Sequence, residues 1–184
     1  LRFDHFDFDV SSDLPANSGS ASDSIASPKA TVVLGPWNET EYFINAGRGF
    51  HSNDARGTTI RVDPTDGVTP VDRVDPLVAA TGGEVGFRSG AIPGLQLYGA
   101  LWGLELDSEL LFVGDGGITE PSRESRRYGV ELGAFWTPLD WLILDVDYAW
   151  SHARFQGYDP AGDRIPGAVE DVASLGVAVN RSDG

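Results

Sequence analysis

One short stretch gathers polar side chains of the kinds that contact ligands. His51, Asn53, Asp54 and Arg56 follow directly on residues 47–50, which read Gly-Arg-Gly-Phe. A polar loop that leaves the end of a rigid strand is a common place for a binding site. The stretch therefore predicts ligand contact at the outer rim of the molecule. The alternative is structural: Asn53 and Asp54 form a turn, and Arg56 pairs with a carboxylate on a neighbouring strand.

Charged residues also recur at alternate positions in the second half of the chain. Residues two apart along a strand point to the same side of the sheet. We therefore predict that six of them share one face on three consecutive strands, where they pair across strands or contact another domain. These residues are Glu105, Asp107, Arg127, Glu131, Asp145 and Asp147.

Other patterns that could carry chemistry lack their partners. The histidines His5, His51 and His152 are far apart in sequence, and the absence of cysteine excludes thiolate sites and disulfides. Residues 114–117 (Gly-Asp-Gly-Gly) lack the Lys-Ser/Thr of a phosphate loop, and no Gly-x-Ser-x-Gly occurs. Four loop acids could collect Ca²⁺ but lack EF-hand spacing and are interspersed with prolines: Asp63, Asp66, Asp72 and Asp75. We predict no enzyme activity, no cofactor and no metal site.

Composition narrows the class further. A formal net charge of −15 argues against nucleic acid as a partner, because a phosphate backbone needs a basic face. The longest aliphatic runs are short, such as residues 141–144, so a membrane could be crossed only with strands. Methionine is absent and no signal peptide is recognisable, so we expect an internal piece of a longer protein.

The elements that must position these residues are β-strands. Apolar and polar residues alternate over long stretches, and no stretch combines helical apolar spacing with good caps. Along 95–113, for example, we expect Tyr98, Trp102 and Leu104 on an apolar face, opposite Glu105 and Asp107. The alternation predicts about eight strands, at residues 2–10, 29–36, 40–50, 78–91, 95–113, 125–137, 141–155 and 168–180.

Strand length and connection length favour a membrane barrel. Several strands exceed the ~5–6 residues usual in globular proteins. The connections alternate between short ones (36–39, 92–94 and 138–140) and long ones (11–27, 51–77, 114–124 and 156–167). Short periplasmic turns and long extracellular loops alternate in this way in outer-membrane barrels. We therefore predict an antiparallel up-and-down meander that forms part of a larger transmembrane barrel, with the charged face toward the lumen.

Aromatic residues bracket the predicted apolar bands. Trp136 and Trp141 flank one short turn, and Tyr128 and Trp150 lie about eight residues further along their strands. With a rise of ~3.3 Å per residue and a tilt of ~45°, eight residues gain roughly 19 Å of height. This is close to the ~25 Å apolar band between the aromatic girdles of such barrels.

Particular segments resemble a known family. Residues 41–57 resemble TonB-dependent outer-membrane receptors, in which a strand ending in a Gly-aromatic step enters a large surface loop. Residues 125–132 (Ser-Arg-Arg-Tyr-Gly-Val-Glu-Leu) look like a recurrent strand start of that family, and a Pro turn and a Trp-Leu-x-Leu-Asp strand follow at 141–145. Residues 153–155 and 165–168 fit the same pattern, so the resemblance covers about residues 29–180.

The resemblance implies a function as well as a fold. Such a receptor is a barrel of about 22 strands in the bacterial outer membrane, surrounded by lipid and filled by an N-terminal plug domain. It binds a scarce small-molecule nutrient, often a siderophore-like metal chelate, and imports it with energy passed on by TonB. Residues 1–184 would form a partial barrel domain, because no plug, TonB box or terminal aromatic residue is recognisable.

Two other classes stay open at this point. A complete eight-stranded barrel with a structural or adhesion role would require the strand at 168–180 to pair with that at 2–10. A soluble β-sandwich that binds a ligand would require Leu142, Leu144 and Val146 to pack against a second sheet.

Overall fold

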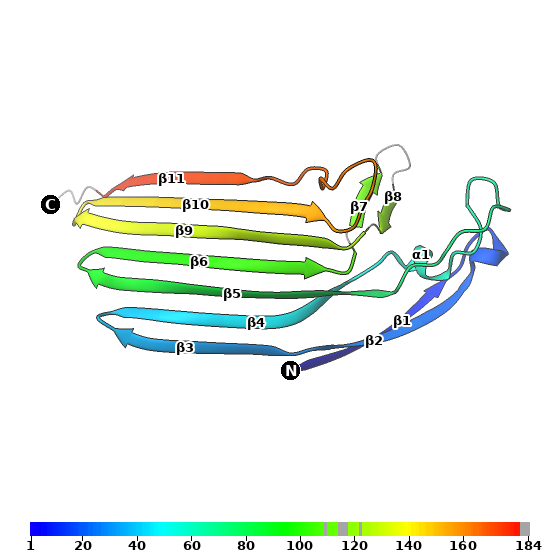
Figure 1. Ribbon diagram of the computed structural model, residues 1–184, viewed down its shortest axis with the longest axis horizontal. Helices are drawn as coiled ribbons and strands as arrows, with labels where there is room; N and C mark the ends of the chain where they lie inside the picture. Colours follow the sequence, from blue (N-terminus) through cyan, green and yellow to red (C-terminus); the bar gives the residue numbers. More distant parts are fainter. Residues whose placement is uncertain (109, 114–117, 122, 181–184) are drawn as a thin grey trace. The chain divides into compact units, whose positions relative to one another are not determined.

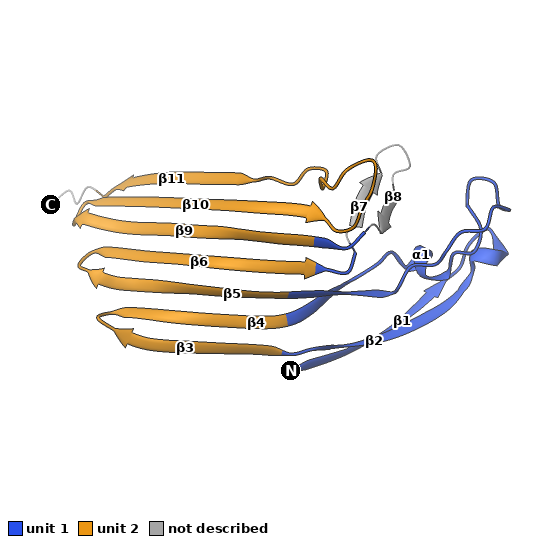
Figure 2. Ribbon diagram, viewed as in Figure 1, with its two compact units in different colours: residues 1–28, 48–81, 106–125 blue, residues 29–47, 82–105, 126–184 orange. Residues whose placement is uncertain are grey.

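The chain folds almost entirely into antiparallel β-structure, which confirms the predicted fold class (Figure 1). The computed structural model describes residues 1–108, 110–113, 118–121 and 123–180. They divide into two compact units, which are treated separately (Figure 2). Unit 1 comprises Leu1–Pro28, Arg48–Thr81 and Leu106–Ser125, and unit 2 comprises Lys29–Gly47, Gly82–Glu105 and Arg126–Gly184.

Unit 2 is built on a seven-stranded sheet in which strands that follow each other in the chain lie side by side. The order is β11-β10-β9-β6-β5-β4-β3, an up-and-down meander. Five of its strands have 12 to 16 residues, enough to cross a bilayer at a tilt, which takes ~9–11. The bounds are β3 (Lys29–Trp37), β4 (Thr40–Ser52), β5 (Leu77–Ile92), β6 (Leu95–Leu106), β9 (Ser125–Leu139), β10 (Leu142–Phe155) and β11 (Asp171–Val179).

Three tight turns join pairs of strands at one end of this sheet. Asn38 and Glu39, with φ of 49° and 55°, connect β3 to β4, the left-handed pair that a two-residue hairpin turn requires. Gly94, with φ of 74°, serves the turn between β5 and β6. The turn from β9 to β10 follows Leu139. The three short connections predicted from the sequence are therefore confirmed.

The two faces of the sheet differ in chemistry. Between β10 and β11, Leu144 pairs with Val177, whereas Asp147 pairs with Ser174 on the other side. We name these sides the apolar face and the polar face. Contacts between side chains, and between side chains and glycines, of neighbouring strands show which residues of the other strands lie on each face. The apolar face includes Val32, Ile44, Val85, Phe87, Leu101, Tyr128, Leu132, Val146, Trp150 and Leu175; the polar face includes Phe43, Asn45, Glu84, Arg88, Tyr98, Trp102, Arg127, Glu131, Asp145 and Asp147.

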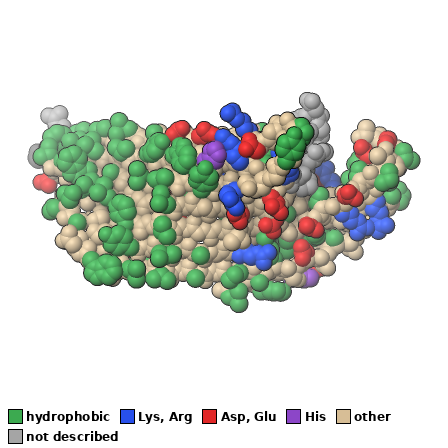
Figure 3. Space-filling view, in the orientation of Figure 1, with side chains coloured by type: hydrophobic (Ala, Val, Ile, Leu, Met, Phe, Trp, Pro, Cys, Tyr) green, Lys and Arg blue, Asp and Glu red, His purple; other side chains and the backbone are tan. Residues whose placement is uncertain are grey.

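The apolar face is uncovered. Ile44, Leu132, Val146 and Leu175 keep 49%, 47%, 46% and 74% of their surface exposed. Figure 3 shows hydrophobic side chains spread over the sheet toward the tight turns, and Arg, acidic and His side chains toward the opposite strand ends. Within the described residues of unit 2 no second sheet packs on this face, which is the opposite of what a β-sandwich requires.

Unit 1 contains its own small core. The hairpin of β1 (Arg2–Val10) and β2 (Gly19–Ser27) pairs residue by residue from Arg2 with Ser27 to Val10 with Gly19. A short 3-10 helix, η1 (Pro15–Asn17), lies in its connection, and α1 (Ala55–Thr59) follows β4. Ile25, Leu77 and Ala79 form the buried centre, against which three aromatic side chains pack: Phe6, Phe8 and Phe50.

Several predicted boundaries are wrong. The supposed loop at 11–27 contains η1 and β2, because a run of small polar residues forms a strand when it can pair with β1. The predicted strand at 95–113 ends at Leu106, and a separate hairpin of β7 (Leu110–Val113) and β8 (Ile118–Pro121) follows. Glu109 and the glycine-rich residues 114–117 lie outside the described residues.

The order of strands in the sheet shows whether these residues close a barrel. Its outermost strands are β3 and β11, and β1 pairs with β2. In the part of the chain that the structure describes, the pair of strands that a complete eight-stranded barrel would require therefore does not form. The barrel is therefore not closed by these residues. No helix among the described residues is long and apolar enough to span a membrane. The prediction of one barrel domain over 1–184 stays a prediction.

Candidate functional site

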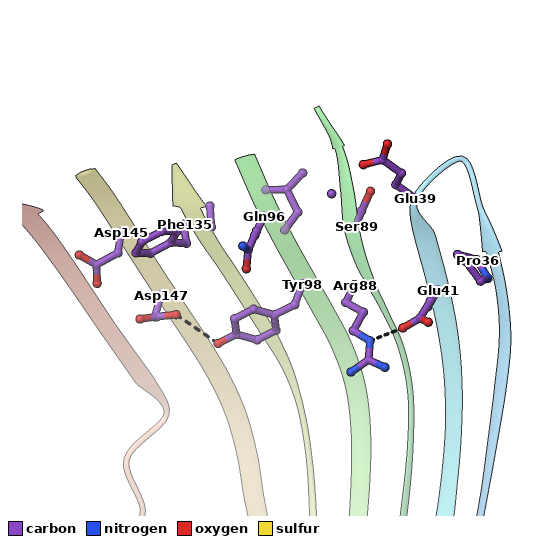
Figure 4. A pocket seen from close by; sticks show the side chains of 13 residues that line it. Pro36, Glu39, Glu41, Arg88, Ser89, Gln96, Tyr98, Phe135, Asp145 and Asp147 are labelled. Carbon is purple, nitrogen blue, oxygen red and sulfur yellow. Dashed lines mark hydrogen bonds and ion pairs between the residues drawn. The ribbon is translucent and has the colours of Figure 1, made fainter. Parts of the chain in front are cut away.

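The polar face of unit 2 holds a depression of about 600 Å³ close to the tight turns (Figure 4). Its floor is formed by strands from β4 to β10, because alternate residues of each strand point to this side. Figure 4 shows carboxylates at both flanks, with an arginine and a tyrosine between them. The lining includes Glu39, Glu41, Arg88, Ser89, Gln96, Tyr98, Phe135, Asp145 and Asp147.

An ion pair bounds one side of this depression. Arg88 Nε donates to Glu41 Oε2 at 2.5 Å, across the β4–β5 pair. Four residues further along each of the same strands, Asn45 Nδ2 donates to Glu84 Oε1 at 2.6 Å. Glu41 and Glu84 therefore each have a donor on the neighbouring strand, as expected for cross-strand pairs.

A tyrosine spans three strands on the other side. The ring of Tyr98 on β6 lies over Gly133 on β9, where any Cβ atom would overlap it. Its hydroxyl then reaches β10 and donates to Asp147 Oδ1 at 3.1 Å. The other oxygen of this carboxylate accepts a hydrogen bond from Ser174 Oγ at 3.3 Å. Glycine is needed at position 133 because a neighbouring side chain occupies the space above it.

Four of the six predicted charges share the polar face. Asp145 and Asp147 lie at alternate positions of β10, and Arg127 and Glu131 occupy the positions of β9 in phase with Gly133. Asp145 stands over Gly176 of β11, as Tyr98 stands over Gly133.

The prediction for the other two charges is wrong. Glu105 lies on the apolar face and binds Arg126, with 2.6 Å between Nη2 and Oε1. Asp107 lies beyond the end of β6, where its backbone N–H donates to Ala79 O. The error arose because both faces of β6 carry apolar residues, so alternation alone misassigned its sides.

The predicted ligand loop begins at the end of β4, in unit 1. Asn53 is 6% exposed; its Nδ2 donates to Asp75 O at 2.7 Å, and its N–H donates to Pro76 O at 3.0 Å. Asp54 caps α1 by accepting from Arg56 N at 2.9 Å. The two bonds of Asn53 join the two ends of the loop at 53–76 to each other.

Arg56 pairs within the same loop. Its Nη2 lies 2.5 Å from Asp54 Oδ2, and the guanidinium holds the pKa of the Asp54 carboxyl below its usual range. In place of the expected turn at Asn53 and Asp54, Asp54 is the N-cap of the short helix α1. Arg56 pairs with Asp54 and not, as expected, with a carboxylate on a neighbouring strand. Two buried atoms here, His51 Nε2 and Asn53 Oδ1, find no hydrogen-bond partner among the described residues.

A further residue that shapes this loop escaped sequence reasoning. Asn17 of η1 is 6% exposed, and its side-chain oxygen accepts from Arg61 N at 2.9 Å and Val62 N at 3.0 Å. Its amide nitrogen donates to Val62 O at 2.9 Å, while Thr59 Oγ1 donates to its backbone carbonyl at 2.9 Å. Its partners are more than forty residues away in sequence, so no local pattern announces them.

Two of the four loop acids considered for Ca²⁺ accept hydrogen bonds from the local backbone. Asp66 Oδ1 accepts from Val68 N and Thr69 N, both at 2.9 Å, and Asp63 Oδ1 accepts from Thr65 N at 2.7 Å. Such bonds are typical of Asx turns. Over the described residues, no group of three His, Asp or Glu side chains is placed to hold a metal ion.

Comparison with known proteins gives a consistent family. The family model described as "TonB dependent receptor-like, beta-barrel" matches residues 1–182. Among solved structures, the "Copper transporter OprC" has a TM-score of 0.70 at 17% identity, covering 92% of this chain and 26% of its own. The FrpB iron transporter from Neisseria meningitidis (F3-3 variant) has a TM-score of 0.64 at 15% identity, covering 90% and 26%. No curated protein matches.

The chain thus spans about a quarter of the length of these transporters, and at such identities the likeness concerns the fold alone. The family rests on the match over residues 1–182, which agrees with the long antiparallel strands and their uncovered apolar face. The chain belongs to the TonB-dependent receptor family, as part of its β-barrel.

Proposed function

We propose that these residues form part of the barrel wall of a bacterial outer-membrane receptor that imports a siderophore-like metal chelate with energy from TonB. The observation that carries the proposal is the family match over residues 1–182. The metal as cargo is supported by the names of two structural neighbours, a copper transporter and an iron transporter.

The two faces of the sheet fit this placement. The apolar face would contact lipid, because its side chains are exposed and a bilayer is the solvent that such a face requires. The polar face would line the lumen, with the tight turns on the periplasmic side. There the charges of the depression would contact the plug domain, which like the TonB-binding segment belongs to the parent receptor outside these residues.

Ligand contact would fall to the long loops on the opposite side. We propose that the loop shaped by His51, Asn53, Asp54 and Arg56 contacts the ligand. Asp54 and Arg56 are the exposed members, with 31% and 69% of their side-chain surface accessible. Asn53 holds the base of the loop closed. A ligand carrying carboxylate or catecholate oxygens would compete with Asp54 for the guanidinium.

Uptake by living cells tests the proposal. A strain lacking the full-length receptor, and strains expressing it as wild type or with Arg56→Gln, are supplied with a panel of radiolabelled iron and copper chelates. We expect uptake of one chelate to require both the receptor and TonB, and Arg56→Gln to weaken its binding about tenfold, the loss of one charge-assisted hydrogen bond. Equal uptake with and without the receptor for every metal chelate would overturn it.

A further inference from the structure

Three basic side chains stand at one end of the apolar face, where an outer-membrane protein meets lipid headgroups. Arg126 lies on β9, and His152 and Arg154 lie on β10. All three follow the same two-residue period as Tyr128 and Trp150, so they continue the apolar face beyond these aromatics. Figure 3 shows Arg, acidic and His side chains mixed together beside the hydrophobic part of the sheet.

Ring contacts fix this arrangement. The Tyr128 ring centroid lies 5.9 Å from that of Trp150 and 5.2 Å from that of His152. Since β9 and β10 are antiparallel neighbours, the residue two before Tyr128 comes to lie beside His152 and Arg154. Tyrosine and tryptophan collect at the interface between hydrocarbon and headgroups, so the basic groups lie at headgroup level.

Arg126 retains donors for an additional anion. Its Nε and Nη2 both contact the same oxygen of Glu105, Oε1, at 2.8 Å and 2.6 Å. A guanidinium has five N–H groups, so three are not used by the bonds to Glu105. Its side chain is 57% exposed and that of Glu105 is 60% exposed, and exposed ion pairs of this kind are easily opened.

Arg154 is held more firmly and serves as a second positive charge. Its Nη1 and Nη2 lie 3.3 Å and 3.2 Å from Glu170 Oε1, Nη1 also donates to Ala153 O at 2.7 Å, and Nε lies 3.9 Å from Asp163 Oδ1. Only 22% of its side chain is exposed. The carboxylates keep the region near neutral until a stronger acceptor competes for the guanidinium groups.

We propose that this region, centred on Arg126, binds the phosphate group of a lipid in the outer leaflet. Arginine matches phosphate oxygens with paired N–H donors, and the acyl chains of the same lipid would lie along the apolar face below Tyr128 and Trp150. The inference rests on the membrane placement in the proposed function. The inference adds a specific class of lipid to that placement. Binding of the lipid does not depend on transport activity.

Lipid retention by the purified full-length receptor tests this site. The receptor is exchanged in detergent into lipid A carrying both phosphates, or into the same lipid after enzymatic removal of the phosphates, and bound lipid is counted by native mass spectrometry. We expect the wild type to prefer the phosphorylated lipid about tenfold, and Arg126→Gln to lose most of this preference.

Arg88→Gln supplies the matched control. Arg88 is likewise an exposed arginine paired with a glutamate on the neighbouring strand, but it lies on the polar face. We expect this variant to keep the wild-type preference. An equal loss of preference in both variants overturns the site. Equal retention of the two lipids by the wild type also overturns it, and this comparison holds even if Arg126→Gln fails to fold. Uptake is measured separately, so a receptor that carries no metal chelate but keeps its phosphorylated lipid would refute only the proposed function.

Discussion

The anchoring of the long loop by Asn17 is open to a direct test. Replacing Asn17 with alanine removes the acceptor for Arg61 N and Val62 N and the donor to Val62 O. All three bonds are partly shielded from water, so each contributes about 0.5–1.5 kcal/mol. We therefore expect the loop at 53–76 to lose about 2–4 kcal/mol against local opening, while strands of the seven-stranded sheet keep theirs.

Hydrogen exchange of the full-length receptor measures this quantity residue by residue. A loss of 2–4 kcal/mol corresponds to about 30- to 1000-fold faster exchange at Arg61 and Val62. Thr59→Val is the control, because it removes only the single hydrogen bond to the Asn17 carbonyl and leaves the three bonds of the Asn17 side chain in place. We expect its effect to be about a third as large in free energy. If the alanine variant exchanged like the wild type at these amides, or if exchange rose equally in β9 and β10, the anchoring argument would be refuted.

Three further predictions concern other parts of the chain. Val146→Arg, on the apolar face, should cost the receptor about 2–4 kcal/mol in urea unfolding in lipid, whereas Ser174→Arg on the polar face should cost far less. Gly133→Ala should displace the aromatic ring over it and cost about 1–3 kcal/mol in the same assay, while Gly49→Ala, which points into open space, should be close to neutral. Because the pKa of Asp54 is lowered on folding, its contribution is complete above the ordinary value of 3.8 and is lost below it. Exchange of the α1 amides, corrected for intrinsic rates, should therefore accelerate only below about pH 3.8; acceleration already at pH 5 would contradict the role of this pair.

Sequence reasoning succeeded where one physical rule governs a long stretch. In β9 and β10 the two-residue alternation is nearly unbroken, so both the strands and the shared face of Arg127, Glu131, Asp145 and Asp147 could be predicted. The tight turns could be predicted equally well, since proline or glycine occurs at or next to each of them. Each of these signals is local and needs no knowledge of neighbouring strands.

The failures lie where a strand or a site depends on its partner. β2 consists largely of serine, alanine and glycine, which have little preference of their own for a strand, and it forms by pairing with β1. The anchoring of Thr59, Arg61 and Val62 by Asn17 joins positions more than forty residues apart. Such contacts become visible only once the hairpin and the loop are placed together.

The misassigned faces of β6 suggest a rule for barrels that lack a clean alternation. The aromatic residues Tyr98 and Trp102 lie on the polar face because glycines of β9, at positions 133 and 129, leave room for their rings. On the apolar face the ring of Phe87 uses Gly99 of β6 in the same way, with 2.7 Å from a built Cβ to Cε1. A strand glycine thus marks the face on which a neighbouring strand presents a large ring, whatever that ring's hydrophobicity. Matching glycines to aromatics across adjacent strands would have placed Tyr98 beside Asp147 and Glu105 on the apolar face, where its partner Arg126 supplies the proposed phosphate site.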